Sequence, residues 1–202
     1  MRPCDQVACH RFPCADVRTE CYLVPDVDVQ PEDIWIVLIS EAAPPDAADG
    51  YYAGGDSLFE QTTVQAFKDA GADVESIGDV LHLGVYLTTA VKCGKTGYGI
   101  STATVKECSL LLERELSIFS NARAYLLMGD VAIRSINYIS TRAGGARAIP
   151  PGSTYRIRGA EYRFRGGRAF PSYLQAGPSF FIEKTKRAMI AQDIAAALAV
   201  ER

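Results

Sequence analysis

The sequence predicts an α/β protein: a three-layer α/β/α sandwich around a mainly parallel four-stranded sheet. Short apolar runs alternate with segments of helical periodicity, which is typical of parallel strands joined by helices. The runs lack a polar alternation, as expected for strands that are buried on both faces. The chain has 202 residues and is 48% hydrophobic, so we expect one domain over residues 1–202.

The first half of the chain contains two predicted strand–helix units. Residues 1–30 show no periodicity, and we expect a cysteine-bearing N-terminal segment there. The apolar run 34–39 predicts a buried strand. An approximate 3.6-residue period that ends at a glycine predicts a helix over 57–71. The pattern repeats with a strand over 83–92 and a helix over about 102–119.

The second half continues the alternation. The run 124–128 predicts a strand, and 130–139 predicts a helix. An arginine-rich stretch predicts a hairpin over 155–164. A last strand over 169–173 leads into a final helix over about 179–200.

Composition bears on the class of protein. The net charge of −3 gives no overall attraction to nucleic acid or to an acidic membrane. No apolar stretch approaches the roughly 20 residues of a membrane span, and the N-terminus lacks the apolar core of a signal peptide. We therefore expect a cytoplasmic protein with no membrane partner, and we expect it to be a monomer. A hydrolase with a catalytic histidine would have to use one of only two histidines, and no glycine-rich phosphate-binding motif follows a strand.

The six cysteines fall into two groups. Four lie in the N-terminal segment, whereas Cys93 follows a predicted strand and Cys108 lies early in a predicted helix. Four converging thiolates can hold a metal ion or an iron–sulfur cluster, and reduced cytoplasmic thiols disfavour disulfides. The alternative is that some are ordinary buried thiols, which suits Cys21.

Three loops should meet where parallel strands end, since ligands bind at the carboxyl ends of such strands. They are residues 40–55, 88–99 and 171–178. They carry groups that can activate water, stack on a ring or donate hydrogen bonds. These groups are Glu41, Asp46, Asp49, Tyr51, Tyr52, Thr88, Thr89, Lys92, Ser172, Tyr173 and Gln175. The alternative is that the acids are solvated and the threonines pack.

Arginines are concentrated between residues 142 and 168. This stretch contains seven arginines and only one acidic residue, Glu161. Guanidinium groups pair with phosphate oxygens, so this stretch is a candidate nucleic-acid contact. Its candidate DNA-binding residues are Arg156, Arg158, Arg163 and Arg165. A solvated hairpin would show the same pattern.

Several motifs together resemble the uracil-DNA glycosylase superfamily, most of all its iron–sulfur, family 4-like branch of bacterial and archaeal enzymes. The similarity runs from about Cys9 to the last helix. The motifs are Ser40-Glu41-Ala42-Ala43-Pro44, Tyr51-Tyr52-Ala53-Gly54, Thr88-Thr89-Ala90-Val91-Lys92-Cys93, Cys108 before a leucine-rich helix, Met128-Gly129-Asp130 and Phe170-Pro171-Ser172-Tyr173. The resemblance implies a [4Fe–4S] cluster, with zinc as the alternative. Its implied ligands are Cys9, Cys14, Cys93 and Cys108, with Cys4 or Cys21 open as replacements.

The resemblance also implies a function: hydrolysis of the N-glycosidic bond of uracil or another modified base flipped out of single- or double-stranded DNA. Glu41, helped by Asp46 or Asp49, would act on the water, and Tyr52 would stack on the base. Thr89 replaces the asparagine that reads the base in the family.

Other departures from the family pattern concern its first and last motifs. Ser40 replaces a glycine, an extra alanine precedes Pro44, and Leu174 replaces the histidine that steadies the departing base. Ser172, Tyr173 and Gln175 would then lie near the base or the DNA backbone. Two alternatives remain: a catalytically silent iron–sulfur protein that binds nucleic acid or a partner through the arginine-rich stretch, and an enzyme of free nucleosides.

Overall fold

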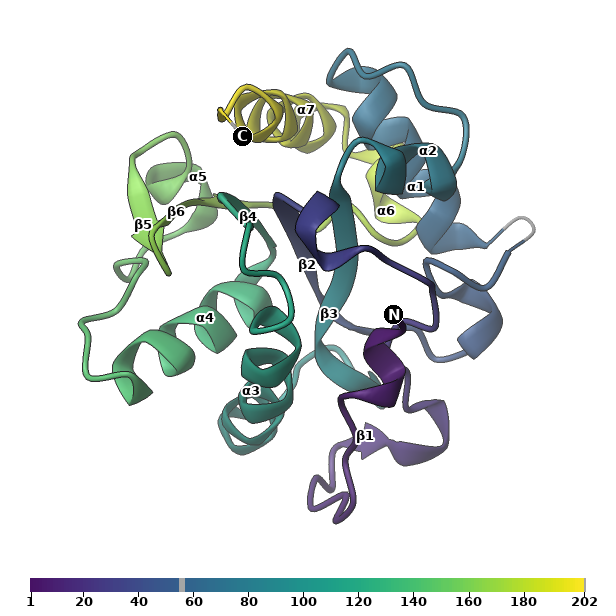
Figure 1. Ribbon diagram of the computed structural model, residues 1–202, viewed down its shortest axis with the longest axis vertical. Helices are drawn as coiled ribbons and strands as arrows, with labels where there is room; N and C mark the ends of the chain where they lie inside the picture. Colours follow the sequence, from purple (N-terminus) through teal and green to yellow (C-terminus); the bar gives the residue numbers. More distant parts are fainter. Residues whose placement is uncertain (55–56, 202) are drawn as a thin grey trace.

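The computed structural model describes residues 1–54 and 57–201 and has a six-stranded sheet at its centre (Figure 1). The strand order is β1-β3-β2-β4-β6-β5. The four middle strands are parallel, and both edge strands are antiparallel to their neighbours. The strands are β1 (Val17–Arg18), β2 (Ile36–Ala43), β3 (Val85–Lys95), β4 (Ala124–Met128), β5 (Tyr162–Phe164) and β6 (Gly167–Ser172).

The predicted α/β fold is confirmed, but the predicted number of four strands was wrong. The four predicted strands correspond to β2, β3, β4 and β6. The additional edge strands contain only two and three residues, which is too short for a period-two pattern to be recognised.

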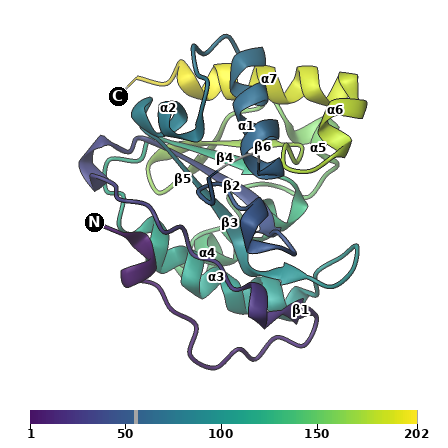
Figure 2. The same cartoon turned by 90° about the vertical axis from the view of Figure 1, so that its right-hand side faces the viewer.

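Helices cover both faces of the sheet (Figures 1 and 2). One face carries α3 (Thr102–Leu116) and α4 (Asp130–Arg142). The other carries α1 (Leu58–Asp69), α2 (Ile77–His82), α6 (Ser179–Ile182) and α7 (Lys184–Leu198). Short 3₁₀ helices are Pro3–Asp5, Thr19–Cys21, Pro31–Asp33 and Ala47–Asp49. None of the helices in the described ranges is long and apolar enough to cross a membrane.

Local sequence explains where three of these helices begin. Ser57, Ser76 and Ser101 each precede a helix, and each side chain accepts a hydrogen bond from a backbone N–H of the first turn. Such caps satisfy donors that the helix leaves unpaired. The expected last helix is divided into α6 and α7 because Glu183 between them is not helical (φ −87°, ψ 69°).

The predicted hairpin over 155–164 was misplaced. Residues Thr154–Ile157 form the short helix α5, and the hairpin instead joins β5 to β6. Its two-residue turn has positive φ at both positions, 49° at Arg165 and 81° at Gly166. This geometry fits the twist of antiparallel strands, although arginine at the first position is an uncommon turn signal.

Candidate functional site

The loops that follow β2, β3 and β6 meet at the carboxyl edge of the sheet and line a cavity of ≈ 670 Å³. We call it the Glu41 cleft. Its polar and apolar walls come from all three loops and from α1. They include Glu41, Pro44, Asp49, Phe59, Lys95 and Leu174. The topology thus brings candidate residues from distant parts of the sequence into one cavity.

Glu41 is the central polar residue of this cleft. Its side chain is 20% exposed, and its Oε2 lies 3.7 Å from Nζ of Lys95. A Cβ atom on Gly129 would lie 2.6 Å from Oε1 of Glu41, and Gly129 has φ +98°. Glycine at 129 therefore lets the carboxylate approach the N-terminus of α4, where the helix dipole favours a negative charge.

The other two predicted acids take different positions. Asp49 lines the Glu41 cleft, and its Oδ1 accepts a hydrogen bond from the backbone N–H of Leu58 at 3.5 Å. Asp46 is exposed, and its Oδ1 accepts from the backbone N–H of Ala48 at 3.0 Å. Asp46 thus caps a short helix, whereas Asp49 shares the cleft with Glu41.

A smaller cavity of ≈ 240 Å³ adjoins the cleft. We call it the Tyr52 pocket, and Pro44 and Phe59 line both cavities. Its wall includes Tyr51, Tyr52, Thr88 and Thr89. The hydroxyl of Tyr52 accepts a hydrogen bond from the backbone N–H of Leu87 at 2.9 Å, which fixes the ring.

Gln175, Tyr51 and Ser40 form a buried chain of hydrogen bonds behind these cavities. Nε2 of Gln175 donates to the Tyr51 hydroxyl at 2.8 Å, and that hydroxyl donates to Oγ of Ser40 at 2.8 Å. Oγ of Ser40 donates to the carbonyl of Thr88 at 3.3 Å. Burial raises the pKa of Tyr51 to about 12, so its hydroxyl stays protonated. The chain ties together the loops that shape the site.

Ser172 and Arg158 point into the protein, contrary to their expected place at DNA. Ser172 is fully buried and donates to Oδ2 of Asp193 at 2.6 Å. Arg158 holds the same carboxylate with two hydrogen bonds of 2.8 and 3.1 Å. Tyr173 is half-buried, and the Lys186 ammonium lies 5.7 Å from its ring centroid.

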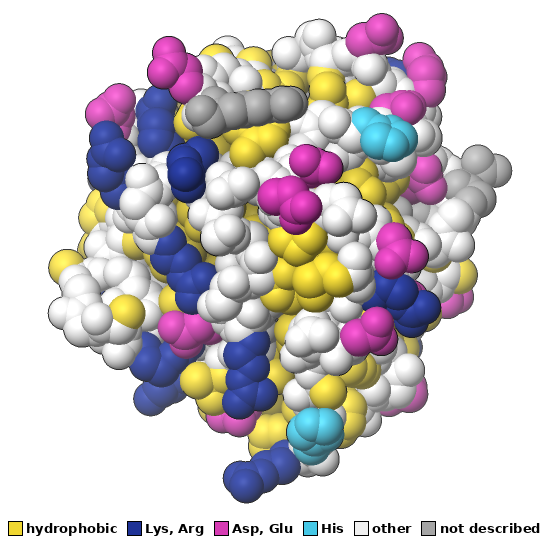
Figure 3. Space-filling model, viewed as in Figure 1, with side chains coloured by type: hydrophobic (Ala, Val, Ile, Leu, Met, Phe, Trp, Pro, Cys, Tyr) yellow, Lys and Arg dark blue, Asp and Glu magenta, His cyan; other side chains and the backbone are white. Residues whose placement is uncertain are grey.

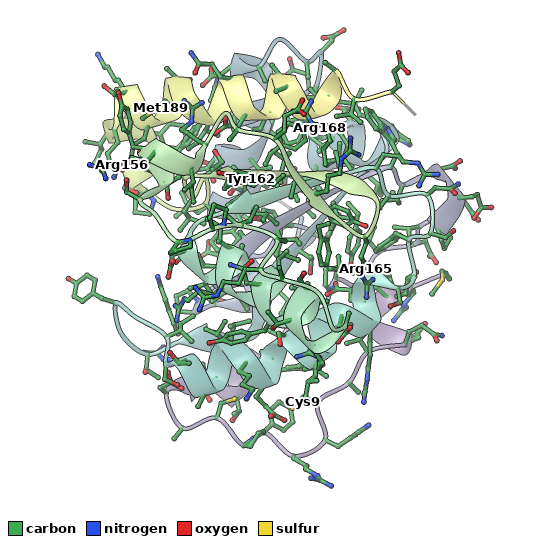
Figure 4. The ribbon with its side chains drawn as sticks, turned by 90° about the vertical axis from the view of Figure 1, so that its left-hand side faces the viewer. Cys9, Arg156, Tyr162, Arg165, Arg168 and Met189 are labelled. Carbon is green, nitrogen blue, oxygen red and sulfur yellow. The ribbon has the colours of Figure 1, made fainter. Side chains whose placement is uncertain are left out.

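The remaining predicted arginines do not share one surface. Figure 4 shows Arg165 toward one end of the sheet and Arg156 toward the other. Arg165 contacts Ser117 at 3.3 Å, and its guanidinium lies 5.7 Å from the Phe164 ring. Arg163 is exposed, as is Arg156, and within the described ranges neither makes a side-chain hydrogen bond or ion pair. On the face drawn in Figure 3, Lys and Arg side chains gather on the side of β5, α4 and α3.

All four predicted cluster ligands line one cavity of ≈ 290 Å³ beneath α3. Its cysteines are Cys9, Cys14, Cys93 and Cys108. Burial, with the neighbouring thiols as a smaller cause, raises the pKa of Cys93 to about 12. Burial raises that of Cys108 to about 11. In the described part of the chain, no three His, Cys, Asp or Glu side chains form a group that could hold a metal ion.

The other two cysteines lie apart from this cavity. Sγ of Cys21 donates to the carbonyl of Pro45 at 2.9 Å. Sγ of Cys4 lies 3.5 Å from Oδ1 of Asp26. Neither Cys4 nor Cys21 is among the residues that line the cysteine cavity.

A fully buried ion pair between Lys92 and Glu115 lies beside the site, and both side chains are 0% exposed. Lys92 Nζ also donates to Oγ1 of Thr88 at 2.7 Å and to the carbonyl of Thr89 at 2.6 Å. Glu115 accepts from the hydroxyls of Tyr86 and Thr88. The backbone N–H of Lys92 donates to Sγ of Cys108 at 3.3 Å. One residue therefore touches both the cysteine cavity and the wall of the Tyr52 pocket.

Two residues of this region, Lys95 and Glu115, were not named as functional candidates from the sequence. Lys95 ends β3 and lies in the predicted loop 88–99, so its position was the available signal. Glu115 lies within a helix, and nothing in the local sequence distinguishes it from Glu113, which is only partly buried.

Comparison with known proteins gives a limited result. No family model matches the chain, and no curated protein matches it. Among solved structures, the crystal structure of wild-type UNG from Nitratifractor salsuginis is similar, with 12% sequence identity and a TM-score of 0.41. The similarity covers 86% of this chain and 76% of that chain. A likeness of this extent does not assign an activity to the chain.

Proposed function

We propose that this protein is a base-excision glycosylase that hydrolyses the N-glycosidic bond of uracil or another modified base in DNA. The observation that carries the proposal is the half-buried carboxylate of Glu41 in a cleft that adjoins a small aromatic pocket. The pocket is smaller than the roughly 300–1,000 Å³ sites of drug-sized ligands, which suits a single flipped heterocycle. The resemblance of the sequence motifs supports the same assignment.

The two cavities divide the substrate between them. The base enters the Tyr52 pocket and the sugar stays in the Glu41 cleft, so the scissile bond lies near Pro44 and Phe59, which line both. The bond between C1′ and the base nitrogen breaks, and both electrons leave with the base. Water adds to C1′ and loses a proton to Glu41, and the base anion takes up one proton. The products are the free base and an abasic sugar.

The test of this function is product release by the full-length wild-type protein. Oligonucleotides that carry uracil, hypoxanthine, xanthine or an alkylated base are incubated in single- and double-stranded form, beside the corresponding free nucleosides. Chromatography should detect a free base from at least one oligonucleotide. Release from none of them would refute the proposal, and release from nucleosides alone would favour the nucleoside enzyme.

We further propose that the cysteine cavity holds a [4Fe–4S] cluster bound by Cys9, Cys14, Cys93 and Cys108. The support for this proposal is that four thiol side chains line a single cavity. Binding would have to draw these thiols closer together, because among the described residues no three of them form a group that could hold a metal ion. The thiols must lose their protons on binding, which the bound metal drives. Such a cluster would brace the N-terminal segment against β3 and α3, and the proposed reaction does not pass through it.

Changing Cys108 to serine should remove the cluster. Anaerobically purified wild-type protein is expected to absorb near roughly 400 nm through thiolate-bound iron, and Cys108→Ser should lose this band and its bound iron. Cys4→Ser is the matched control and should keep both. If the wild-type protein contains zinc and lacks the absorption band, the cavity binds zinc and not a cluster. If the Cys108→Ser protein keeps its full iron content, Cys108 is not a ligand.

A further inference from the structure

Lys95 is an unassigned cationic group in the Glu41 cleft. Among the described residues that line the cleft it is the only basic one, and the cleft also contains the acids Glu41 and Asp49. Its ammonium lies 3.7 Å from the Glu41 carboxylate, too far for a hydrogen bond, and makes none with the described residues. The side chain is 36% exposed. Its three donors are therefore available to a molecule in the cleft.

The contact with Glu41 does not by itself account for a lysine here. An ion pair at this separation and exposure contributes about 0–1 kcal/mol to stability. Lys184 is exposed on the outer surface and Lys92 is fully buried in its ion pair with Glu115, whereas Lys95 ends β3 and lines the cleft. Because Pro44 and Phe59 line both the cleft and the Tyr52 pocket, Lys95 lies on the side of that pocket on which the proposed scissile bond would be.

We propose that Lys95 is a catalytic residue that stabilises the base anion as the glycosidic bond breaks; this inference rests on the proposed function. When the bond electrons leave with the base, the charge is shared by the ring nitrogen and the adjacent carbonyl oxygen. That edge of the base faces the Glu41 cleft if the ring occupies the Tyr52 pocket. An ammonium there interacts more strongly with the anion than with the neutral base, so it lowers the barrier rather than only improving binding.

Leaving-group dependence provides the test. Single-turnover rates are measured for Lys95→Met and wild-type protein on one oligonucleotide that carries uracil or 5-fluorouracil. Fluorine withdraws electrons and stabilises the anion, so 5-fluorouracil needs less help from the protein. We expect Lys95→Met to lose roughly 100- to 1,000-fold on uracil, and clearly less on 5-fluorouracil. Lys95→Arg should recover part of the rate, and Lys184→Met is the control that keeps it.

Two further measurements distinguish a catalytic role of Lys95 from a role in folding or in DNA binding. The unfolding midpoint and the oligonucleotide Kd of Lys95→Met should stay close to those of the wild-type protein. Equal losses on both bases, or an unchanged rate, would overturn the inference while leaving the proposed function intact. Failure of the wild-type protein to release uracil or 5-fluorouracil would overturn the inference, and failure to release any base from the full set of oligonucleotides would overturn the proposed function as well.

Discussion

Replacing Glu41 with glutamine is expected to reduce base release by at least about 100-fold, the usual contribution of a positioned general base. Glutamine keeps the size of the side chain but cannot accept a proton from water or balance a sugar cation. Gly129 holds the site open for this side chain, because any Cβ there would meet Oε1. Single-turnover release from the preferred oligonucleotide measures the effect.

Asp46→Asn is the matched control for this change. Asp46 belongs to the same loop but is exposed, caps the short helix Ala47–Asp49 and does not itself line the cleft. The Asp46→Asn protein should release base at close to the wild-type rate. If Glu41→Gln retained full activity, the carboxylate would have no role in the chemistry, and a different residue of the cleft would have to activate the water.

Glu115→Gln is expected to lower the free energy of unfolding by about 3–5 kcal/mol, because it leaves Lys92 charged and unpaired in the interior. Neither side chain of this pair is exposed. Thr88 and Tyr86 would also lose their charged acceptor. Urea denaturation followed by circular dichroism gives the change in the free energy.

Glu113 in the same helix is a matched control. It forms an ion pair with Arg142, and both side chains are about one-third exposed (29% and 31%). Glu113→Gln should cost only about 0–1 kcal/mol. The double variant Lys92→Met/Glu115→Leu removes both buried charges and should recover much of the loss of Glu115→Gln. Equal costs for Glu113→Gln and Glu115→Gln would show that the buried pair has no special energetic role.

The layered fold was predictable because short stretches of the sequence are enough to identify its main strands and helices. Apolar runs without alternation mark buried parallel strands, and Ser57, where the first helix was expected to begin, caps α1. The edge strand β1 was missed because it has two residues and pairs with β3, which is distant in sequence. The strand β5 lies inside the predicted hairpin stretch, which was misplaced because the turn falls at Arg165 and Gly166.

The candidate site was predictable in place but not in detail. Glu41 and Asp49 were expected at the ends of strands, and the structure brings them into one cleft. Side-chain direction is not encoded in such local patterns. Arginine-rich sequence suggested a common surface, yet Arg158 turns inward to Asp193, a residue 35 positions later. Long-range partners of this kind become visible only when the chain is folded.

Lys92 gives the protein a thermodynamic link between two distant properties. Its backbone N–H holds Cys108, and its ammonium holds Thr88 and Thr89 in the wall of the Tyr52 pocket. A shift of Lys92 caused at the cysteine cavity therefore also changes the wall of the Tyr52 pocket, and the reverse holds because such coupling is reciprocal. If the cysteine cavity holds the proposed cluster, a ligand in the pocket that favours one position of Lys92 would change the affinity of the thiols for the cluster. The cluster would change the affinity for the ligand by the same factor.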